Sequence, residues 1–354
     1  WPAEGPTEVR GAYKARGPGL EAGPALLFAQ APDPSPGLEA DGDGPWGEAG
    51  QAPDPGYLEC IAKSATKLPD TPALPCPGWL VVGECENRHR YAKVLACGQE
   101  WCPTCGTEWS AVHQRRFARW LPKVQQVREM GYLVITVPEK MRGLPGWFHS
   151  KRGLRRATDL AVDLVAGKRQ GRKGRTGGWW GRGLARWHYF GDEHPGKWHP
   201  HLNILVEGGY LGRKRLRELR RELRRAWLLP QEPVINYHYT GQPAKMVHWL
   251  KYVTRATFRD QDWDPEMADQ LYGFRNGRWW GKWDGPPAWE LDQAQDQGQG
   301  ADLVDLVAVE KLESGECPVC GKPLDWSRPL ARVWLDIWGA RPLGGGYYAL
   351  EGCA

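Results

Sequence analysis

Apolar and polar positions follow two different periods along the middle of the chain. Short runs rich in aliphatic and aromatic residues predict strands, which span residues 132–140, 184–190, 199–205 and 235–239. Segments whose apolar positions recur every three or four residues predict helices, which span residues 111–130, 150–167, 213–229 and 243–258. Pro122 lies inside the first of these helices and predicts a break or kink there. The order of these elements predicts an α+β fold in which helices pack on a sheet.

The strand at 199–205, His-Pro-His-Leu-Asn-Ile-Leu, has the clearest chemical signal. Successive strand residues point to opposite faces, so His199, His201 and Asn203 share one face and the residues after each histidine lie on the other. Two imidazoles and an amide oxygen on one rigid face can hold a divalent metal ion. The alternative is that these are ordinary histidines at the surface or the edge of the core.

The helix at 243–258 places a tyrosine between a histidine and an arginine. His248, Tyr252 and Arg255 stand at positions i, i+4 and i+7, on a face separate from the apolar one. The apolar stripe consists of Met246, Val247, Leu250 and Val253. A tyrosine with these neighbours is suited to attack a phosphodiester, because Arg255 can hold a phosphate oxygen. An ordinary amphipathic helix with an interfacial tyrosine would show the same stripe.

Three segments, taken in order, resemble the motifs of HUH endonucleases. This family comprises the rolling-circle replication initiators of plasmids and phages and the related HUH transposases. The segments are GYLVITVPEK (131–140), WHPHLNILVEGG (198–209) and WLKYVTR (249–255). The resemblance covers about residues 85–260, and the second segment is its most specific part.

The resemblance implies a fold and a reaction. The fold is the HUH/Rep nuclease fold, a central antiparallel sheet with the metal strand in the middle and the tyrosine helix packed across it. The reaction is nicking and joining of single-stranded DNA, in which Tyr252 forms a 5′-phosphotyrosine and releases a 3′-hydroxyl that primes replication. A small zinc-binding module before the first motif is also typical of the family.

One departure from the family concerns the metal ligands. Asn203 stands where the second histidine of the motif is expected, and its amide oxygen favours Mg²⁺ or Mn²⁺ over Zn²⁺. His199 lies on the same strand face as His201 and can take over as a ligand. His188 is a further candidate, because an adjacent antiparallel strand could place it opposite His201. The remaining alternatives are Asp192 and Glu193.

A second departure concerns the number of tyrosines. Two-tyrosine members carry tyrosines one helical turn apart, but here the position four residues before Tyr252 is His248. The chain is therefore expected to be a single-tyrosine enzyme, in which His248 could act as a general base or contact a phosphate. Tyr237 and Tyr239 on the preceding strand are weak candidates for a second nucleophile.

The nine cysteines predict structural zinc rather than disulfides in a reducing cytoplasm. Cys97, Cys102 and Cys105 form a knuckle, and Cys85 is the expected fourth ligand. Alternative fourth ligands are Cys76, His89 and His113. Unligated buried thiols are the competing interpretation.

A second Cys-x-x-Cys pair lies near the end of the sequence. Cys317 and Cys320 supply only half of a zinc site, Cys353 could be a third ligand, and no fourth ligand is evident. The sequence leaves it open whether this pair binds a second zinc ion.

Positive charge is unevenly distributed in a chain of net charge +5. Residues 1–56 are acidic and rich in Gly, Pro and Ala, and predict a disordered tail. The stretch 110–260 is rich in Arg and Lys, which indicates a polyanionic partner unless these groups are only solvated surface. The residues expected to contact DNA are Lys168, Arg169, Arg172, Lys173, Arg175 and Lys251.

The sequence divides into four expected parts, namely a tail at 1–56, a zinc module at 57–115, a nuclease domain at 116–290 and a C-terminal region at 291–354. We expect a cytoplasmic, metal-dependent DNA endonuclease that initiates rolling-circle replication of a plasmid or virus. Its partners would be single-stranded or hairpin DNA and a host helicase and polymerase, with no membrane. The alternatives are a transposase of the same chemistry and a zinc-dependent DNA-binding protein with a decayed nuclease site.

Overall fold

The computed structural model describes the following parts of the chain: residues 76–97, 102–143, 147–167, 179–190, 197–257, 267, 270–294, 301–327 and 329–350. Several predictions lie outside these residues. They are the tail at 1–56, the DNA contacts at Lys168, Arg169, Arg172, Lys173 and Arg175, and the alternative ligands Asp192, Glu193 and Cys353.

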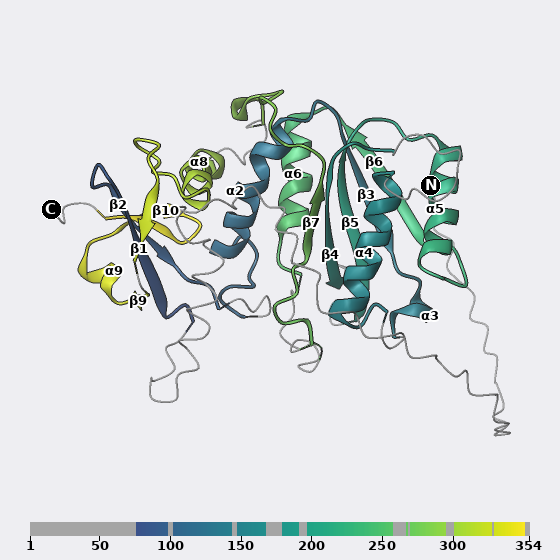
Figure 1. Ribbon diagram of the computed structural model, residues 1–354, viewed down its shortest axis with the longest axis horizontal. Coiled ribbons are helices and arrows are strands. Elements are labelled where there is room, and N and C mark those ends of the chain that lie inside the picture. Colours follow the sequence, from purple (N-terminus) through teal and green to yellow (C-terminus); the bar gives the residue numbers. More distant parts are fainter. Residues whose placement is uncertain are drawn as a thin grey trace, which may run out of the picture. The chain divides into compact units, whose positions relative to one another are not determined.

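A five-stranded antiparallel sheet forms the middle of the described chain (Figure 1). Its strand order is β6-β3-β5-β4-β7. The strands are β3 (Met130–Thr136), β4 (Gly183–Phe190), β5 (Trp198–Glu207), β6 (Val234–Thr240) and β7 (Gly277–Trp280). The strand that carries His201 is therefore central, with β3 on one side and β4 on the other.

Helices cover both faces of this sheet (Figure 1). On one face, α4 (Lys151–Val165) and α5 (Arg213–Ala226) pack on the apolar residues of the strands. The side chains at that core include Leu133, Trp187, Leu202, Ile204 and Trp227. On the other face, α2 (Ala111–Gln125) and α6 (Pro243–Thr254) pack on Tyr132 and Leu205. The face toward α6 is the one that carries the polar residues of β5.

Two helices differ from those that the sequence predicted. Pro122 lies inside α2, which continues to Gln125 without the predicted break. Helix α6 ends at Thr254 rather than at residue 258, so Arg255 is its C-cap in an extended conformation and not a helical residue. The Thr254 hydroxyl donates to the Leu250 carbonyl at 2.8 Å and also reaches the Lys251 carbonyl at 3.3 Å, one of the carbonyls that the helix end leaves open.

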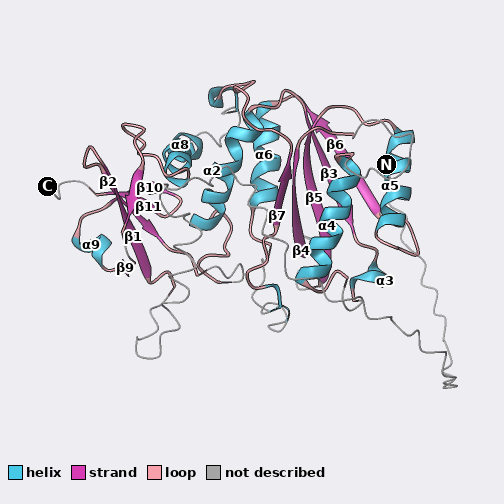
Figure 2. Ribbon diagram, viewed as in Figure 1, coloured by secondary structure: helices cyan, strands magenta, loops and turns pink. Residues whose placement is uncertain are grey.

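A second sheet joins the two ends of the described chain (Figure 2). It has the order β10-β11-β2-β1-β8, and β9 also pairs with β1. Its strands are β1 (Trp79–Cys85), β2 (Arg90–Val94), β8 (Leu324–Trp326), β9 (Leu330–Ala331), β10 (Arg341–Gly344) and β11 (Tyr347–Ala349). Strands from the expected zinc module at 57–115 and from the expected C-terminal region at 291–354 pair in one six-stranded sheet, so the described parts of these two regions fold together.

A buried ion pair connects this six-stranded sheet to α2. Glu313 ends α8 (Ala301–Glu313), and its carboxylate lies 3.1 Å from Lys93 Nζ and 3.2 Å from Arg119 Nε. The Tyr347 hydroxyl donates to the same carboxylate at 2.6 Å. The remaining short elements are α3 (Glu139–Arg142), η1 (Leu291–Ala294) and α9 (Trp334–Ile337). Every helix in the described part of the chain is too short or too polar to cross a membrane.

Candidate functional site

Two histidines lie side by side on neighbouring strands, His188 on β4 and His201 on β5. The register pairs His188 with His201, so both side chains lie on the sheet face covered by α6. Their ring centroids are 5.4 Å apart, and both side chains are buried. The structure thus brings together two of the expected ligands that are 13 positions apart in the sequence.

His188 is held as a neutral ring. Its Nε2 lies 3.1 Å from the Val253 carbonyl oxygen, and because a carbonyl can only accept, Nε2 carries the proton. Nδ1 therefore keeps its lone pair, and this buried atom has no hydrogen-bond partner. Burial lowers the pKa of His188 well below its ordinary value, and the charges of His201, Arg255 and Arg186 act in the same direction. A buried lone pair of this kind is suited to bind a cation or accept a proton.

His201 has the opposite tautomer in its neutral form. Its Nδ1 lies 3.0 Å from the His199 carbonyl oxygen, so Nδ1 donates and Nε2 carries the lone pair. The His199 ring is only partly buried, and its centroid is 5.9 Å from that of His201. In the described part of the chain, no set of three His, Cys, Asp or Glu side chains at this site has its ligand atoms within 4.8 Å of one another.

Tyr252 lies directly against this pair. Its ring centroid is 5.3 Å from that of His188 and 6.3 Å from that of Tyr132 on β3. The Arg255 guanidinium carbon lies 3.8 Å from the centre of the Tyr252 ring. Although Arg255 is not on the helical face that the sequence predicted, the chain turns at the end of α6 and returns its side chain to the tyrosine.

Asn203 occupies the next inward position of β5. Its side chain is fully buried, and its Oδ1 accepts a hydrogen bond of 2.6 Å from the Tyr132 hydroxyl. Its Nδ2 is buried without a hydrogen-bond partner. An amide oxygen has two lone pairs, so the bond from Tyr132 leaves one lone pair of Oδ1 for a second interaction.

Cationic and imidazole groups hold the last carbonyls of α6. Arg116 Nη1 donates to the Thr254 carbonyl at 2.6 Å, and His113 Nε2 donates to the Lys251 carbonyl at 2.9 Å. Arg186 Nη2 donates to the Arg255 carbonyl at 3.4 Å. These contacts satisfy backbone groups that a helix end leaves open. They fix the end of α6, and with it the position of Tyr252.

Sequence reasoning did not find Arg116, Arg186 or Tyr132 as residues of this site. Arg186 and Tyr132 lie at the same period-two positions as His188 and Asn203, on strands next to β5. That alternation is the signal that would have indicated them once the strands were aligned. Arg116 has no such signal, because its partner is a carbonyl 138 residues away.

The other candidates of the sequence lie around this centre. His248 is exposed on α6, one turn before Tyr252. The Lys251 ammonium lies 4.2 Å from the centre of the Trp109 ring. Tyr237 donates its hydroxyl to the Gly209 carbonyl, and Tyr239 is exposed on the edge strand β6.

The first group of cysteines is completed by a residue other than the expected one. Cys76, Cys97, Cys102 and Cys105 have their sulfur atoms within 4.8 Å of one another, and this group could hold a metal ion such as zinc. Cys85, the expected fourth ligand, is not part of it. Cys76 lies three residues before Trp79, the first residue of β1, whereas Cys85 is the last residue of β1. An extended strand of this length places its two ends about 20 Å apart. The alternative His113 is also excluded from this group, because it lies on α2 against Lys251.

The second group takes Cys85 instead. Cys85, His89, Cys317 and Cys320 come within 4.8 Å of one another and could also hold a metal ion. The knuckle at Cys317 and Cys320 is thus joined by Cys85 and His89 from the turn between β1 and β2, while Cys353 lies outside the described residues.

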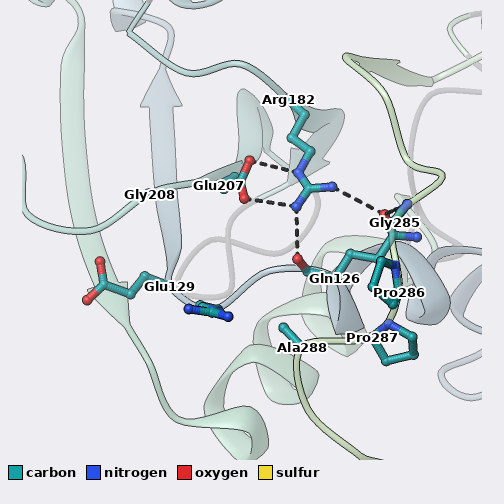
Figure 3. A pocket seen from close by; sticks show the side chains of 10 residues that line it. Gln126, Glu129, Arg182, Glu207, Gly208, Gly285, Pro286, Pro287 and Ala288 are labelled. Carbon is teal, nitrogen blue, oxygen red and sulfur yellow. Dashed lines mark hydrogen bonds and ion pairs between the residues drawn. The ribbon is translucent and has the colours of Figure 1, made fainter.

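A pocket of about 670 Å³ lies at the other end of the five-stranded sheet (Figure 3). Arg182 is its central cation, and its guanidinium bonds both oxygens of Glu207 at 2.7 and 2.8 Å. It also donates to Gln126. Glu207 lies six residues beyond His201 on β5, or about 20 Å away, so this pocket is not part of the histidine and tyrosine site.

Comparison with known proteins returned no match to any family model, to any curated protein or to any solved structure.

Proposed function

We propose that the chain is a single-tyrosine HUH endonuclease that nicks and joins single-stranded DNA and so initiates rolling-circle replication of a plasmid or virus. The observation that carries the proposal is the contact of Tyr252 with His188, which itself lies beside His201. A nucleophilic hydroxyl and two imidazoles from three different elements converge at this one place. Tyr252 and His201 come from two of the three sequence segments that resemble the HUH motifs. His188 comes from β4, the strand that pairs with the second of these segments on β5.

The arrangement of the strands supports the same proposal. The first two HUH-like segments lie on β3 and β5, which are neighbours in the middle of an antiparallel sheet. The third lies on α6, which packs across the face that carries His201. This is the arrangement that the resemblance implies for the HUH/Rep nuclease fold.

The donor set fits a divalent metal ion. His188 Nδ1 and His201 Nε2 offer nitrogen lone pairs from paired strand positions, and Asn203 Oδ1 offers an oxygen. Two nitrogens and an amide oxygen suit Mn²⁺ or Mg²⁺ better than the thiolate groups of the six-stranded sheet do. When bound, the metal would polarise the scissile phosphate.

The residues of the chain would then carry out a phosphoryl transfer. The Tyr252 hydroxyl gives up its proton to solvent as its oxygen attacks the phosphorus, the bond from phosphorus to the 3′ oxygen breaks, and the leaving oxygen takes up a proton from solvent to become a 3′-hydroxyl. The Arg255 guanidinium over the tyrosine ring neutralises charge on the phosphate. Arg116 and Arg186 act as positioning residues, because they hold the backbone that ends α6.

Formation of a covalent adduct tests the proposal. The protein is incubated with Mn²⁺ and labelled single-stranded oligonucleotides that tile both strands of the replicon that encodes it. We expect a denaturation-resistant protein–DNA adduct that is lost in Tyr252→Phe and retained in Tyr239→Phe, a matched change at an exposed tyrosine.

Two other outcomes would contradict the proposal. Absence of an adduct on every strand would favour a DNA-binding protein with a decayed site. Transfer of the labelled strand to unrelated target DNA, with no support of replication, would favour a transposase.

A further inference from the structure

Two distant segments of the chain meet at the second cysteine group. Cys85 and His89 flank the turn between β1 and β2, and Cys317 and Cys320 form a knuckle after α8. The two segments are 235 positions apart at Cys85 and Cys320. The nicking chemistry proposed for Tyr252 uses none of these side chains.

The distances match the edges of a zinc tetrahedron. Cys85 Sγ lies 3.7 Å from Cys320 Sγ, and His89 Nδ1 lies 3.4 Å from Cys85 Sγ and 3.5 Å from Cys317 Sγ. A tetrahedral zinc ion with ordinary bond lengths separates two sulfurs by about 3.8 Å and a sulfur from a nitrogen by about 3.6 Å. Four protein ligands at these separations leave no open position, as in structural zinc sites.

Each half of this group is a tight turn held by its own backbone. Cys85 N donates to the His89 carbonyl at 3.1 Å, and Cys317 N donates to the Lys322 carbonyl at 2.8 Å. Gly321 closes the second turn with a φ of 67°, a conformation that favours glycine. Cys85 and Cys317 are buried, and the Tyr91 hydroxyl lies 3.4 Å from Cys317 Sγ. The ligands are therefore preorganised inside the sheet rather than gathered by chance on its surface.

We propose that Cys85, His89, Cys317 and Cys320 bind one Zn²⁺ ion that clamps the C-terminal segment 315–350 to the β1–β2 hairpin. The proposal is independent of the proposed endonuclease function.

The strands that attach this segment to the β1–β2 hairpin are short. β8 pairs with β1 over three residue pairs, β9 pairs with β1 over two, and β11 pairs with β2 over three. Bringing together segments about 230 residues apart costs loop-closure entropy, and metal binding supplies the free energy that such short ladders lack. The clamp also lies next to α8, whose Glu313 carboxylate is buried between Lys93 and Arg119.

Metal analysis of the purified full chain gives the first test. We expect two zinc equivalents in the wild type and one in the Cys317→Ser/Cys320→Ser double variant. The matched variant Cys102→Ser/Cys105→Ser should lose the other equivalent, and Cys353→Ser should keep both. A Cys317→Ser/Cys320→Ser variant that keeps as much zinc as the wild type would overturn the proposal.

Substitutions at His89 keep the test informative if the double variant does not fold. His89→Cys should retain two equivalents, because four thiolates also form a closed zinc site, whereas His89→Ala should lose the second zinc to a weak chelator about tenfold faster or more. Limited proteolysis then measures the clamp itself. His89→Ala should be cut within residues 315–350 at least about tenfold faster than His89→Cys, and equal rates would show that no clamp exists. Adduct formation at Tyr252 is scored separately, so that failure of either proposal is distinguishable from failure of the other.

Discussion

His188 on β4 and His201 on β5 occupy paired strand positions and lie side by side on the sheet face that α6 covers, with ring centroids 5.4 Å apart and both rings buried. If they hold the metal ion of a nuclease, each must supply an essential nitrogen. We expect His201→Ala and His188→Ala each to slow formation of the DNA adduct by about 100-fold at a fixed Mn²⁺ concentration, because a lost ligand lowers metal affinity and removes charge stabilisation. The rate should be measured over a Mn²⁺ titration.

His238→Ala is the matched control, since that histidine is exposed on the edge strand β6. It should leave the rate unchanged. DNA binding without metal, followed by fluorescence anisotropy, should stay within about threefold for all three variants. Equal rates for His201→Ala and His238→Ala would remove His201 from the metal site.

Strand register could be predicted from the sequence where the strands are long. Residues 184–190 and 199–205 alternate between apolar and polar faces, so antiparallel pairing sets His188 opposite His201, as the structure places them. Ligation by these residues stays a prediction. β8 and β9 have only three and two residues, which is too short for any period to show. The six-stranded sheet was therefore not predicted.

The cysteine ligands show a second limit of sequence spacing. Cys85 is much closer in the sequence to Cys97 than to Cys317, which is why it was expected in the first group. β1 is an extended strand and carries Cys85 to the opposite end of the hairpin, where β8 brings Cys317 and Cys320. Which thiols share a metal depends on this long-range pairing, and spacing along the chain does not contain it.

The exposed cations of helix α5 are expected to contribute to DNA affinity in a way that depends on salt concentration. It lies on the sheet face opposite to Tyr252 and exposes Arg213, Lys214, Arg215, Arg217, Arg221, Arg224 and Arg225. We expect Arg213→Gln/Arg217→Gln/Arg221→Gln to reduce the slope of log affinity against log salt concentration by about 2 for single-stranded DNA, because each lost phosphate contact retains its counterion. Titrations between low and moderate salt measure the slope.

The control for α5 removes the same charge elsewhere. Lys322→Gln/Arg332→Gln/Arg341→Gln changes three exposed cations of the six-stranded sheet region and should leave the slope unchanged. If both triple variants lower the slope equally, net charge rather than the α5 surface determines binding.

The buried carboxylate of Glu313 predicts a large loss of stability when its charge is removed. Lys93 and Arg119 lower the pKa of Glu313 to about 2 against the opposing effect of burial. Because the pKa is lower in the folded state, the stability that Glu313 contributes is present above about pH 4.5 and is lost as the pH falls toward 2. Glu313→Gln should cost about 3 kcal/mol at pH 7, since it leaves Lys93 buried without its counter-charge. Urea unfolding measures the loss, and the exposed Glu290→Gln should change stability by less than about 0.5 kcal/mol.

The buried ring of His113 is expected to make the folded protein less stable in mild acid. Burial, together with the charge of Arg116, lowers the pKa of His113 to about 3. The unfolded chain takes up a proton at this residue near pH 6.5 while the folded chain does not, so the stability it contributes is present above pH 6.5 and is lost as the pH falls toward 3.

Replacement of this ring by a side chain that does not titrate isolates the effect. In His113→Gln, an amide can still donate to the Lys251 carbonyl, which His113 Nε2 contacts at 2.9 Å. Between pH 7.5 and pH 5, the stability advantage of the wild type over His113→Gln should shrink by about 2 kcal/mol. Urea unfolding at the two pH values measures this difference, and metal ligands that titrate equally in both proteins cancel from it. A pH-independent difference would mean that His113 has the same pKa in the folded and the unfolded chain, so that neither burial nor Arg116 lowers it.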